Sequence, residues 1–122
     1  MAGFCLLIFY ESSRPIPDVI PPFFGIDKLL HFGAWMVLGF LFYRAFHHAS
    51  RLPAASRALW WVSLLSAAAY GLSDEIHQSF VPFRTADFFD FVADFAGSLC
   101  GTIFISWWYT LLFQKNSRSV TR

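Results

Sequence analysis

Three stretches of this 122-residue chain are apolar over nearly the length that a helix needs to cross a membrane. They are Leu29 to Phe46, Ala58 to Val81 and Phe88 to Phe113, and a transmembrane helix takes about 20 predominantly apolar residues. A fourth apolar stretch, Ala2 to Tyr10, covers only about half a bilayer at roughly 1.5 Å per residue. The pattern predicts four helices, of which the first is a half-span or a truncated span.

Proline and polar residues separate these stretches. The connection from Glu11 to Asp27 contains four prolines, which are incompatible with a helix interior. Pro53 and Pro82 lie in the next two connections. The polar segment 114–122 is expected to form a frayed cytoplasmic tail. The sequence therefore predicts a single membrane domain over residues 1–113, followed by this tail.

The composition supports a membrane location. The chain is 57% hydrophobic and 20% aromatic but only 14% charged, whereas soluble domains carry about 25% charged residues. A soluble chain of this length would need more charge to cover its surface. These values exclude an ordinary soluble enzyme, a disordered tail and a disulfide scaffold. They favour an all-α integral membrane protein, a compact bundle of four transmembrane helices.

The net charge of +1 is spread without any basic patch, so no nucleic-acid partner is predicted. The Lys and Arg residues instead predict the orientation, because they are enriched in cytoplasmic loops. Three of them lie in the first and third connections, namely Arg14, Lys28 and Arg84. Six lie at the other side, namely Arg44, Arg51, Arg57, Lys115, Arg118 and Arg122. Both termini are therefore predicted to face the cytoplasm.

This topology brings most of the acids to one membrane face. Asp27 and His31 are four residues apart, as are Asp74 and Gln78, with Glu75 adjacent. Residues four apart share a helix face. A charge at mid-bilayer depth costs about 2.5–3.5 kcal/mol on insertion scales. We therefore expect these side chains to be paired or to line a wet cavity.

The last helix carries a stripe of residues spaced by three and four, which places them on one face. The stripe consists of Asp87, Asp90, Asp94, Gly97 and Gly101. The two glycines would let another helix approach closely. We expect this face to point into the bundle and to bring its acids into a shared pocket.

Arg84 is the permanent positive charge expected to balance this pocket. A guanidinium bridges two carboxylates well, so we predict that Arg84 bonds Asp90, with Asp74 or Glu75 as its second partner. Asp27 is equally well explained as a helix N-cap. His77 is expected to have an orienting or interfacial role.

Several kinds of chemistry remain open for this pocket. Its acid excess beside His31 suits acid–base chemistry or a divalent cation, and a purely structural network is a third interpretation. No HExxH, CxxC or phosphate-binding loop is present, so neither a metal ligand nor a cofactor is assigned. The candidate catalytic residues are Asp74, Glu75, Gln78 and His31. The candidate substrate-binding residues are Asp27, Lys28, Arg84, Asp90 and Asp94.

Three segments resemble the VanZ-like family in order and spacing: DKLLHF from Asp27, DEIHQSFVPFR from Asp74 and DFVADFAGSLCG from Asp90. The family comprises small bacterial membrane proteins whose namesake is associated with low-level teicoplanin resistance. The resemblance covers about Ser12 to Phe113. The positions that match are Asp27, Lys28, His31, Asp74, Glu75, Gln78, Arg84, Asp90, Gly97 and Gly101.

Two positions depart from the family pattern. Phe83 stands where glycine is usual and is expected to alter the turn before Arg84. Asp94 stands where asparagine is usual and adds a negative charge. The resemblance implies the architecture, the site and a bacterial cytoplasmic membrane, but it implies no particular reaction.

We therefore expect a cell-envelope protein whose outward-facing acidic pocket binds or modifies a membrane amphiphile. This amphiphile would be a lipid-linked precursor, a lipid headgroup or a lipoglycopeptide. The alternatives are an intramembrane acid–base hydrolase or transferase, in which Asp74 or Glu75 is the general base and His31 a proton carrier, and a non-catalytic accessory subunit. The sequence assigns no oligomeric state.

Overall fold

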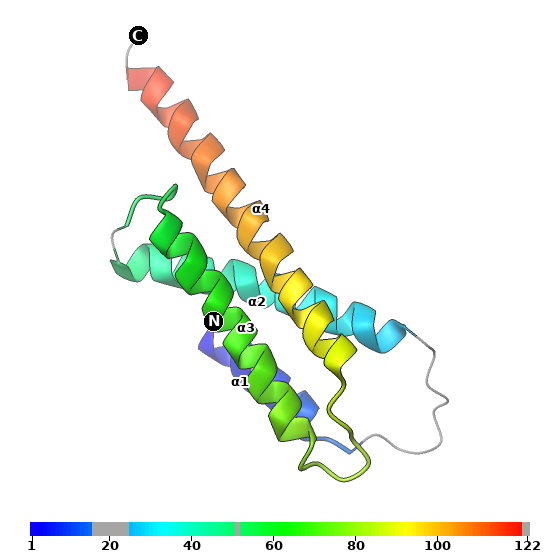
Figure 1. The fold of residues 1–122 in the computed structure, drawn as a ribbon. Coiled ribbons are helices and arrows are strands. Elements are labelled where there is room, and N and C mark those ends of the chain that lie inside the picture. Colours follow the sequence, from blue (N-terminus) through cyan, green and yellow to red (C-terminus); the bar gives the residue numbers. More distant parts are fainter. Residues whose placement is uncertain (16–24, 51, 121–122) are drawn as a thin grey trace.

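The computed structural model describes residues 1–15, 25–50 and 52–120, with side chains described as far as Leu112 (Figure 1). The chain forms four helices: α1 (Ala2–Ser12), α2 (Ile26–Ser50), α3 (Arg57–Gln78) and α4 (Phe88–Val120). The described ranges contain no strand. The predicted all-helical fold with a short first helix is therefore confirmed.

Two segments are long and apolar enough to cross a membrane. They are α2 over its whole length and α4 over Phe88–Leu112. α3 ends in a polar turn and is less apolar than these two segments, and α1 is too short to cross a membrane. Among the described residues, the structure thus supports two of the four predicted transmembrane helices by length and composition.

The observed helix ends follow local chemistry. Ser56 caps α3 by accepting a hydrogen bond from the backbone N–H of Leu59 at 3.5 Å. The Tyr43 hydroxyl donates to the carbonyl of Ala54 and so fixes the connection before α3. The helical backbone of α4 continues to Val120, beyond the point where a frayed tail was predicted. The segment 114–120 contains neither glycine nor proline to stop it.

The predicted close approach along the glycine face of α4 is confirmed. A Cβ atom at Gly97 would collide with the backbone oxygen of Phe32, and one at Gly101 would collide with that of Met36. Phe32 and Met36 are successive positions on one face of α2. The two helix backbones therefore touch where the glycines lie.

α1 accompanies only the C-terminal half of α3 (Figure 1). The Tyr70 hydroxyl donates to the carbonyl of Cys5 at 2.6 Å. Near the end of both helices, Ser13 Oγ lies 2.9 Å from His77 Nε2, and the His77 ring lies 4.7 Å from that of Phe9, centroid to centroid. His77 thus joins α3 to α1 and is positioned away from the acids, as predicted.

Polar and apolar side chains share the interior. The buried polar residues are Ser12 on α1 and, on α3 and α4, Ser63, Asp74, Glu75, Gln78, Asp90, Asp94, Ser98 and Thr102. Large apolar residues on α3 are exposed along one surface: Trp61, Val62, Leu65, Leu72 and Ile76. The apolar interior consists mainly of Trp35, Leu38, Phe42, Ile8 and Ala67. The helices thus bury these polar groups and expose many large apolar groups.

Phe83 adopts a left-handed backbone conformation, with φ of 63°. This conformation costs an L-residue about 1–2 kcal/mol. The structure therefore keeps a turn that suits glycine, although a phenylalanine occupies it. The backbone at Phe83 thus bears strain that a glycine would not, and whether the turn differs from that of the family stays a prediction.

Replacing Phe83 by glycine should stabilise the protein. The side chain is 73% exposed, so little packing is lost, and relief of the left-handed strain outweighs the greater freedom of glycine in the unfolded chain. We expect a gain of about 0.5–1 kcal/mol in the free energy of unfolding. Phe80→Gly is the control, because Phe80 is 80% exposed and outside the left-handed region. Equal effects of the two changes in a detergent unfolding titration would contradict this account.

Candidate functional site

The start of α2, the end of α3 and the start of α4 meet at one end of the bundle, where Lys28 holds the outer part of an acidic cluster. Its Nζ atom lies 2.7 Å from a carboxylate oxygen of Asp87, 2.7 Å from one of Asp90 and 3.2 Å from one of Asp27. Lys28 therefore ties α2 to α4. Asp27 lies inside the first turn of α2, which begins at Ile26, and its carboxylate is exposed.

The predicted ion pair between Arg84 and Asp90 was wrong. Arg84 instead donates from Nε to the carbonyl of Arg14 and from Nη2 to the carbonyl of Glu11, both at 3.0 Å. Carbonyls at a helix C-terminus lack partners within the helix, so Arg84 caps the end of α1. Lys28 takes the place beside Asp90 that was assigned to Arg84.

Asp87 links the outer cluster to the inner one. Its backbone N–H donates to Glu75 Oε2 at 2.9 Å, and its carboxylate caps α4 by accepting from the backbone N–H of Phe89 at 2.8 Å. The hydrogen bond from the Lys28 ammonium holds the pKa of the Asp87 carboxyl below its usual value. The sequence placed Asp87 on the α4 stripe without assigning it a role. Its position directly before Phe88 was the available cap signal.

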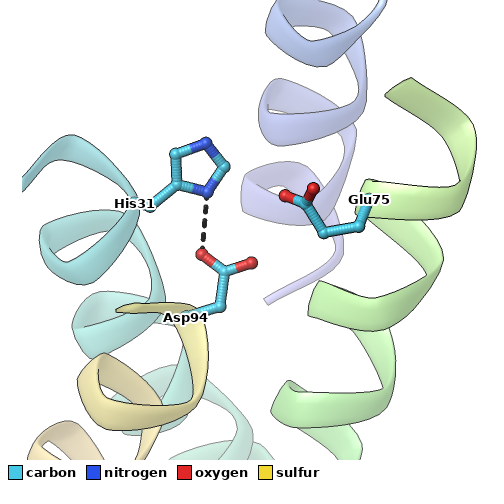
Figure 2. A group of neighbouring side chains, drawn as sticks. All are labelled: His31, Glu75 and Asp94. Carbon is cyan, nitrogen blue, oxygen red and sulfur yellow. Dashed lines mark hydrogen bonds and ion pairs between the residues drawn. The ribbon is translucent and has the colours of Figure 1, made fainter. Parts of the chain in front are cut away.

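Deeper in the bundle, His31, Glu75 and Asp94 come together from three different helices (Figure 2). His31 Nδ1 lies 2.8 Å from Asp94 Oδ1, and His31 Nε2 lies 3.9 Å from a carboxylate oxygen of Asp90. One potential ligand atom from each of the three residues lies within 4.8 Å of the others. The expected meeting of α2, α3 and α4 acids around His31 is thus seen in the structure.

Two carboxylate oxygens in this inner group have no hydrogen-bond partner among the described residues. They are Asp94 Oδ2 and Glu75 Oε1, and both atoms are buried. Asp94 is 0% exposed and Glu75 is 5% exposed. Buried polar atoms are paired in the great majority of cases. This site therefore has unfilled capacity to bind a proton or a cation.

Asp74 and Gln78 lie on a different wall of the site. Gln78 Nε2 donates to Asp74 Oδ2 at 2.8 Å, which confirms the predicted pairing of these two residues. Both face a cavity of about 440 Å³ between α1, α2 and α3. The apolar wall of this cavity includes Phe4, Leu7, Ile8, Leu30, Ala34 and Trp35. Its polar end is formed by Glu11, Ser12, Asp27, His31, Asp74, Gln78 and Arg84.

The candidate residues thus divide into three connected groups. Lys28 and Asp90 form the outer ion cluster together with Asp87 and the exposed Asp27. His31, Glu75 and Asp94 form the inner group. Asp74, Gln78 and Arg84 line the cavity, and His31 belongs to both the inner group and the cavity wall. The cavity between α1 and its neighbours was not foreseen, because the sequence gives no contact for a half-length helix.

These features define an all-helical protein with many exposed apolar side chains and a buried acidic site among its helices. The family model of VanZ/LLP1 matches residues 3–112, and the chain belongs to this family. An uncharacterized protein of Schizosaccharomyces pombe is 37% identical over 97 residues, which cover 80% of this chain and 56% of that protein. The chain thus spans about half the length of this curated relative. No solved structure matches.

Proposed function

We propose that this VanZ/LLP1 protein is a multi-pass membrane protein that binds the amine-bearing headgroup of a membrane lipid in the cavity between α1, α2 and α3. The observation that carries the proposal is the division of this cavity into an apolar wall and an acidic end. An amphiphile has the same division, because its chains are apolar and its headgroup is polar.

The first part is the membrane location of all four helices. α3 has 22 residues, and a helix rises about 1.5 Å per residue, so α3 is about as long as the hydrocarbon is thick. Its exposed surface carries the row of Trp61, Leu65, Leu72 and Ile76, as expected for lipid contact. Its polar residues face α2 and α4, where intramembrane polar groups are normally accommodated. α1 would enter the leaflet that holds the C-terminal half of α3, as a half-span.

The second part is the orientation. The Lys and Arg asymmetry supports a cytoplasmic location for the α2–α3 connection and the C-terminal end of α4. The N-terminus of α1 points toward that same side (Figure 1). A half-span beside the C-terminal half of α3 begins at mid-membrane depth, so the proposal keeps the predicted cytoplasmic C-terminus in a bacterial inner membrane but not the predicted cytoplasmic N-terminus. The acidic end of the cavity then opens outward, to the cell envelope.

The third part is the charge of the ligand. At the polar end of the cavity, the exposed Glu11 and Asp27 already pair with Arg14 and Lys28. Asp74 is buried there and bonded to the neutral amide of Gln78. Arg84 already donates to two backbone carbonyls. An ammonium group complements this end better than an anionic headgroup does. Phosphatidylethanolamine offers an ammonium beside a phosphate, so it suits the acids and Arg84 together.

The fungal relative also favours a common phospholipid as the ligand. A related protein in Schizosaccharomyces pombe supports a ligand that bacterial and fungal membranes share. A common phospholipid headgroup meets this condition, whereas a bacterial wall precursor or a lipoglycopeptide does not. The proposal therefore selects the lipid headgroup from the amphiphiles that the sequence left open.

A pair of neighbouring tryptophan substitutions tests the cavity. Leu30 and Leu29 are both 68% exposed, but only Leu30 lines the cavity. Leu30→Trp should fill the apolar wall and weaken phosphatidylethanolamine binding about tenfold or more, a loss of about 1.4 kcal/mol. Leu29→Trp should leave binding within about twofold of wild type, because it adds area only on the outer surface. Native mass spectrometry of the purified chain, titrated with lipid in the presence of a chelator, measures both.

A change at the polar end tests the headgroup. Asp74→Asn removes one negative charge and keeps a group that bonds Gln78. It should reduce the preference for phosphatidylethanolamine over phosphatidylglycerol while binding of the latter is kept. Equal binding of both lipids by the wild type, together with no effect of Leu30→Trp, would refute the proposal.

A further inference from the structure

We infer that His31, Glu75 and Asp94 form a binding site for one divalent first-row transition metal ion, such as Zn²⁺ or Mn²⁺. One ligand atom from each residue lies within 4.8 Å of the others, so small side-chain rotations suffice to bring all three around one ion. The three residues come from α2, α3 and α4 respectively, so no linear sequence motif contains all three. This inference goes beyond the proposed lipid binding and does not rest on it.

The unpaired oxygens point to a ligand. Asp94 Oδ2 and Glu75 Oε1 are buried and have no partner among the described residues. In Figure 2, the Asp94 oxygen that is not bonded to His31 points toward the side of Glu75. The remaining oxygen of each carboxylate is held in place, by His31 for Asp94 and by the Asp87 backbone N–H for Glu75. Each carboxylate thus has one buried oxygen available for an ion. Because His31 Nε2 faces Asp90, the ion would bind Nδ1 and replace the hydrogen bond between Nδ1 and Asp94 Oδ1.

The charge around this group supports a dication. The buried carboxylates of Glu75 and Asp94 face each other, and His31 is the side chain beside them that could carry a positive charge. Lys28 is already bound to Asp87, Asp90 and Asp27, and Arg84 is bound to the end of α1. Buried carboxylates that lack a counter-charge are strongly disfavoured. A divalent ion between Glu75 and Asp94 would balance both at once.

The donor set selects the kind of metal. One imidazole nitrogen with two carboxylate oxygens suits Zn²⁺, Mn²⁺ and similar ions. Ca²⁺ and Mg²⁺ prefer oxygen ligands alone, and in larger numbers or with several waters. Three protein ligands would leave a coordination position for water or a ligand atom. His31 also lines the cavity, so the metal site adjoins the place where the lipid headgroup is proposed to bind.

The surroundings are those of an ordered metal site. Ligand side chains in such sites are commonly fixed by hydrogen bonds to a second set of groups. Here the Asp87 N–H fixes Glu75, and Asp90 Oδ2 lies 3.9 Å from His31 Nε2. Lys28 in turn holds Asp87 and Asp90 in position. The outer ion cluster therefore supports the inner one.

Metal binding is tested on the full chain purified in detergent. The protein is stripped with a chelator, reloaded with Zn²⁺ alone and freed of excess, and the bound metal is counted by mass spectrometry. We expect one ion per chain. His31→Gln, Glu75→Gln and Asp94→Asn should each weaken binding by about 100-fold or more, since changes even in the supporting residues of such sites cost about 10–100-fold.

Glu11→Gln is the matched control for Glu75→Gln, because it removes an exposed acid at the end of α1 whose side chain pairs with Arg14 and lies outside both clusters. It should change the affinity by no more than about threefold, since exposed charges are screened by salt. Circular dichroism and gel filtration report whether each variant is folded. Should a ligand variant fail to fold, the visible absorption of Co²⁺ bound to the wild type decides, because a nitrogen- and oxygen-bound low-coordinate ion absorbs far more strongly than free Co²⁺.

Two results would overturn the inference. One is a wild-type protein that retains no stoichiometric Zn²⁺ and gives Co²⁺ the spectrum of the free ion. The other is unchanged affinity in folded His31→Gln and Glu75→Gln. In either case a shared proton between Glu75 and Asp94 would account for the unpaired oxygens. The lipid titration is made in a chelator, so its outcome is separate from this one.

Discussion

Gly101→Ala should lower the free energy of unfolding by about 2–3 kcal/mol, as expected for overpacking of a close interface. A Cβ atom at Gly101 would collide with the backbone oxygen of Met36, and it would lie 2.8 Å from the Met36 carbonyl carbon and 3.1 Å from the Phe40 nitrogen. These are backbone atoms, so no side chain can rotate away. The two helices would have to separate along the length over which they pack.

Gly33→Ala is the control for this substitution. Gly33 also lies inside a helix, but a Cβ atom there has no neighbour within 4 Å. Alanine is favoured over glycine in a helix interior by about 1 kcal/mol, so this variant should be neutral or slightly stabilised. Unfolding in a denaturing detergent, followed by circular dichroism, measures both. Equal stability of the two variants would mean that α2 and α4 are not in contact at Gly101.

The sequence predicted the helices well and their ends approximately. Long apolar stretches identified all four helices, because burial in lipid or protein requires that pattern. The apolar stretch from Leu29 begins three residues after the start of α2, whose first turn holds Asp27, the residue that the sequence offered as its N-cap. The apolar stretch to Val81 runs three residues beyond the end of α3 at Gln78.

Contacts within one helix were predicted more reliably than contacts between helices. The spacing of Asp74 and Gln78 gave their hydrogen bond directly, and the spacing of Gly97 and Gly101 gave the close face of α4. Helical geometry is sufficient for such pairs. The partner of Asp90 depended instead on which basic side chain reaches it, and that depends on the distance between α2 and α4, which a sequence does not contain.

The misplaced Arg84 illustrates this limit. Its guanidinium suits two carboxylates, but it also suits the free carbonyls at the end of α1, and the structure brings those carbonyls closer. Lys28 lies three residues before His31 and hence on the same face of α2. That spacing indicated a cation near the acids. Choosing it over Arg84 required the packing of α2 against α4, which only the fold provides.

The role of Asp94 was anticipated only in part. The sequence identified it as an added charge at a position where the family usually has asparagine. The structure shows what that charge does, since Asp94 is fully buried against His31. An asparagine could accept the same hydrogen bond, but it would not pair with a protonated histidine or bind a metal ion as strongly.

The second large effect is expected at this pair. His31→Ala should lower the free energy of unfolding by about 3–5 kcal/mol, because removing one partner of a buried pair leaves the other without compensation. Asp94 would then have no partner on either oxygen among the described residues. Asp94→Asn should cost less, since the amide keeps a bond to His31 and carries no charge. The measurement is made in a chelator, so that no metal contributes to stability.

A double-mutant cycle separates the pair from its surroundings. If the pair is real, the His31→Ala/Asp94→Asn variant should be less destabilised than the sum of the two single variants by about 1 kcal/mol or more, because residues in direct contact couple by about 0.5–3 kcal/mol. His48→Ala in wild type and in Asp94→Asn is the control, since His48 lies at the opposite end of α2 and should show additivity. Additive costs for His31 and Asp94 would show that the two side chains do not interact, and the inner site would then have to be rebuilt around Glu75 alone.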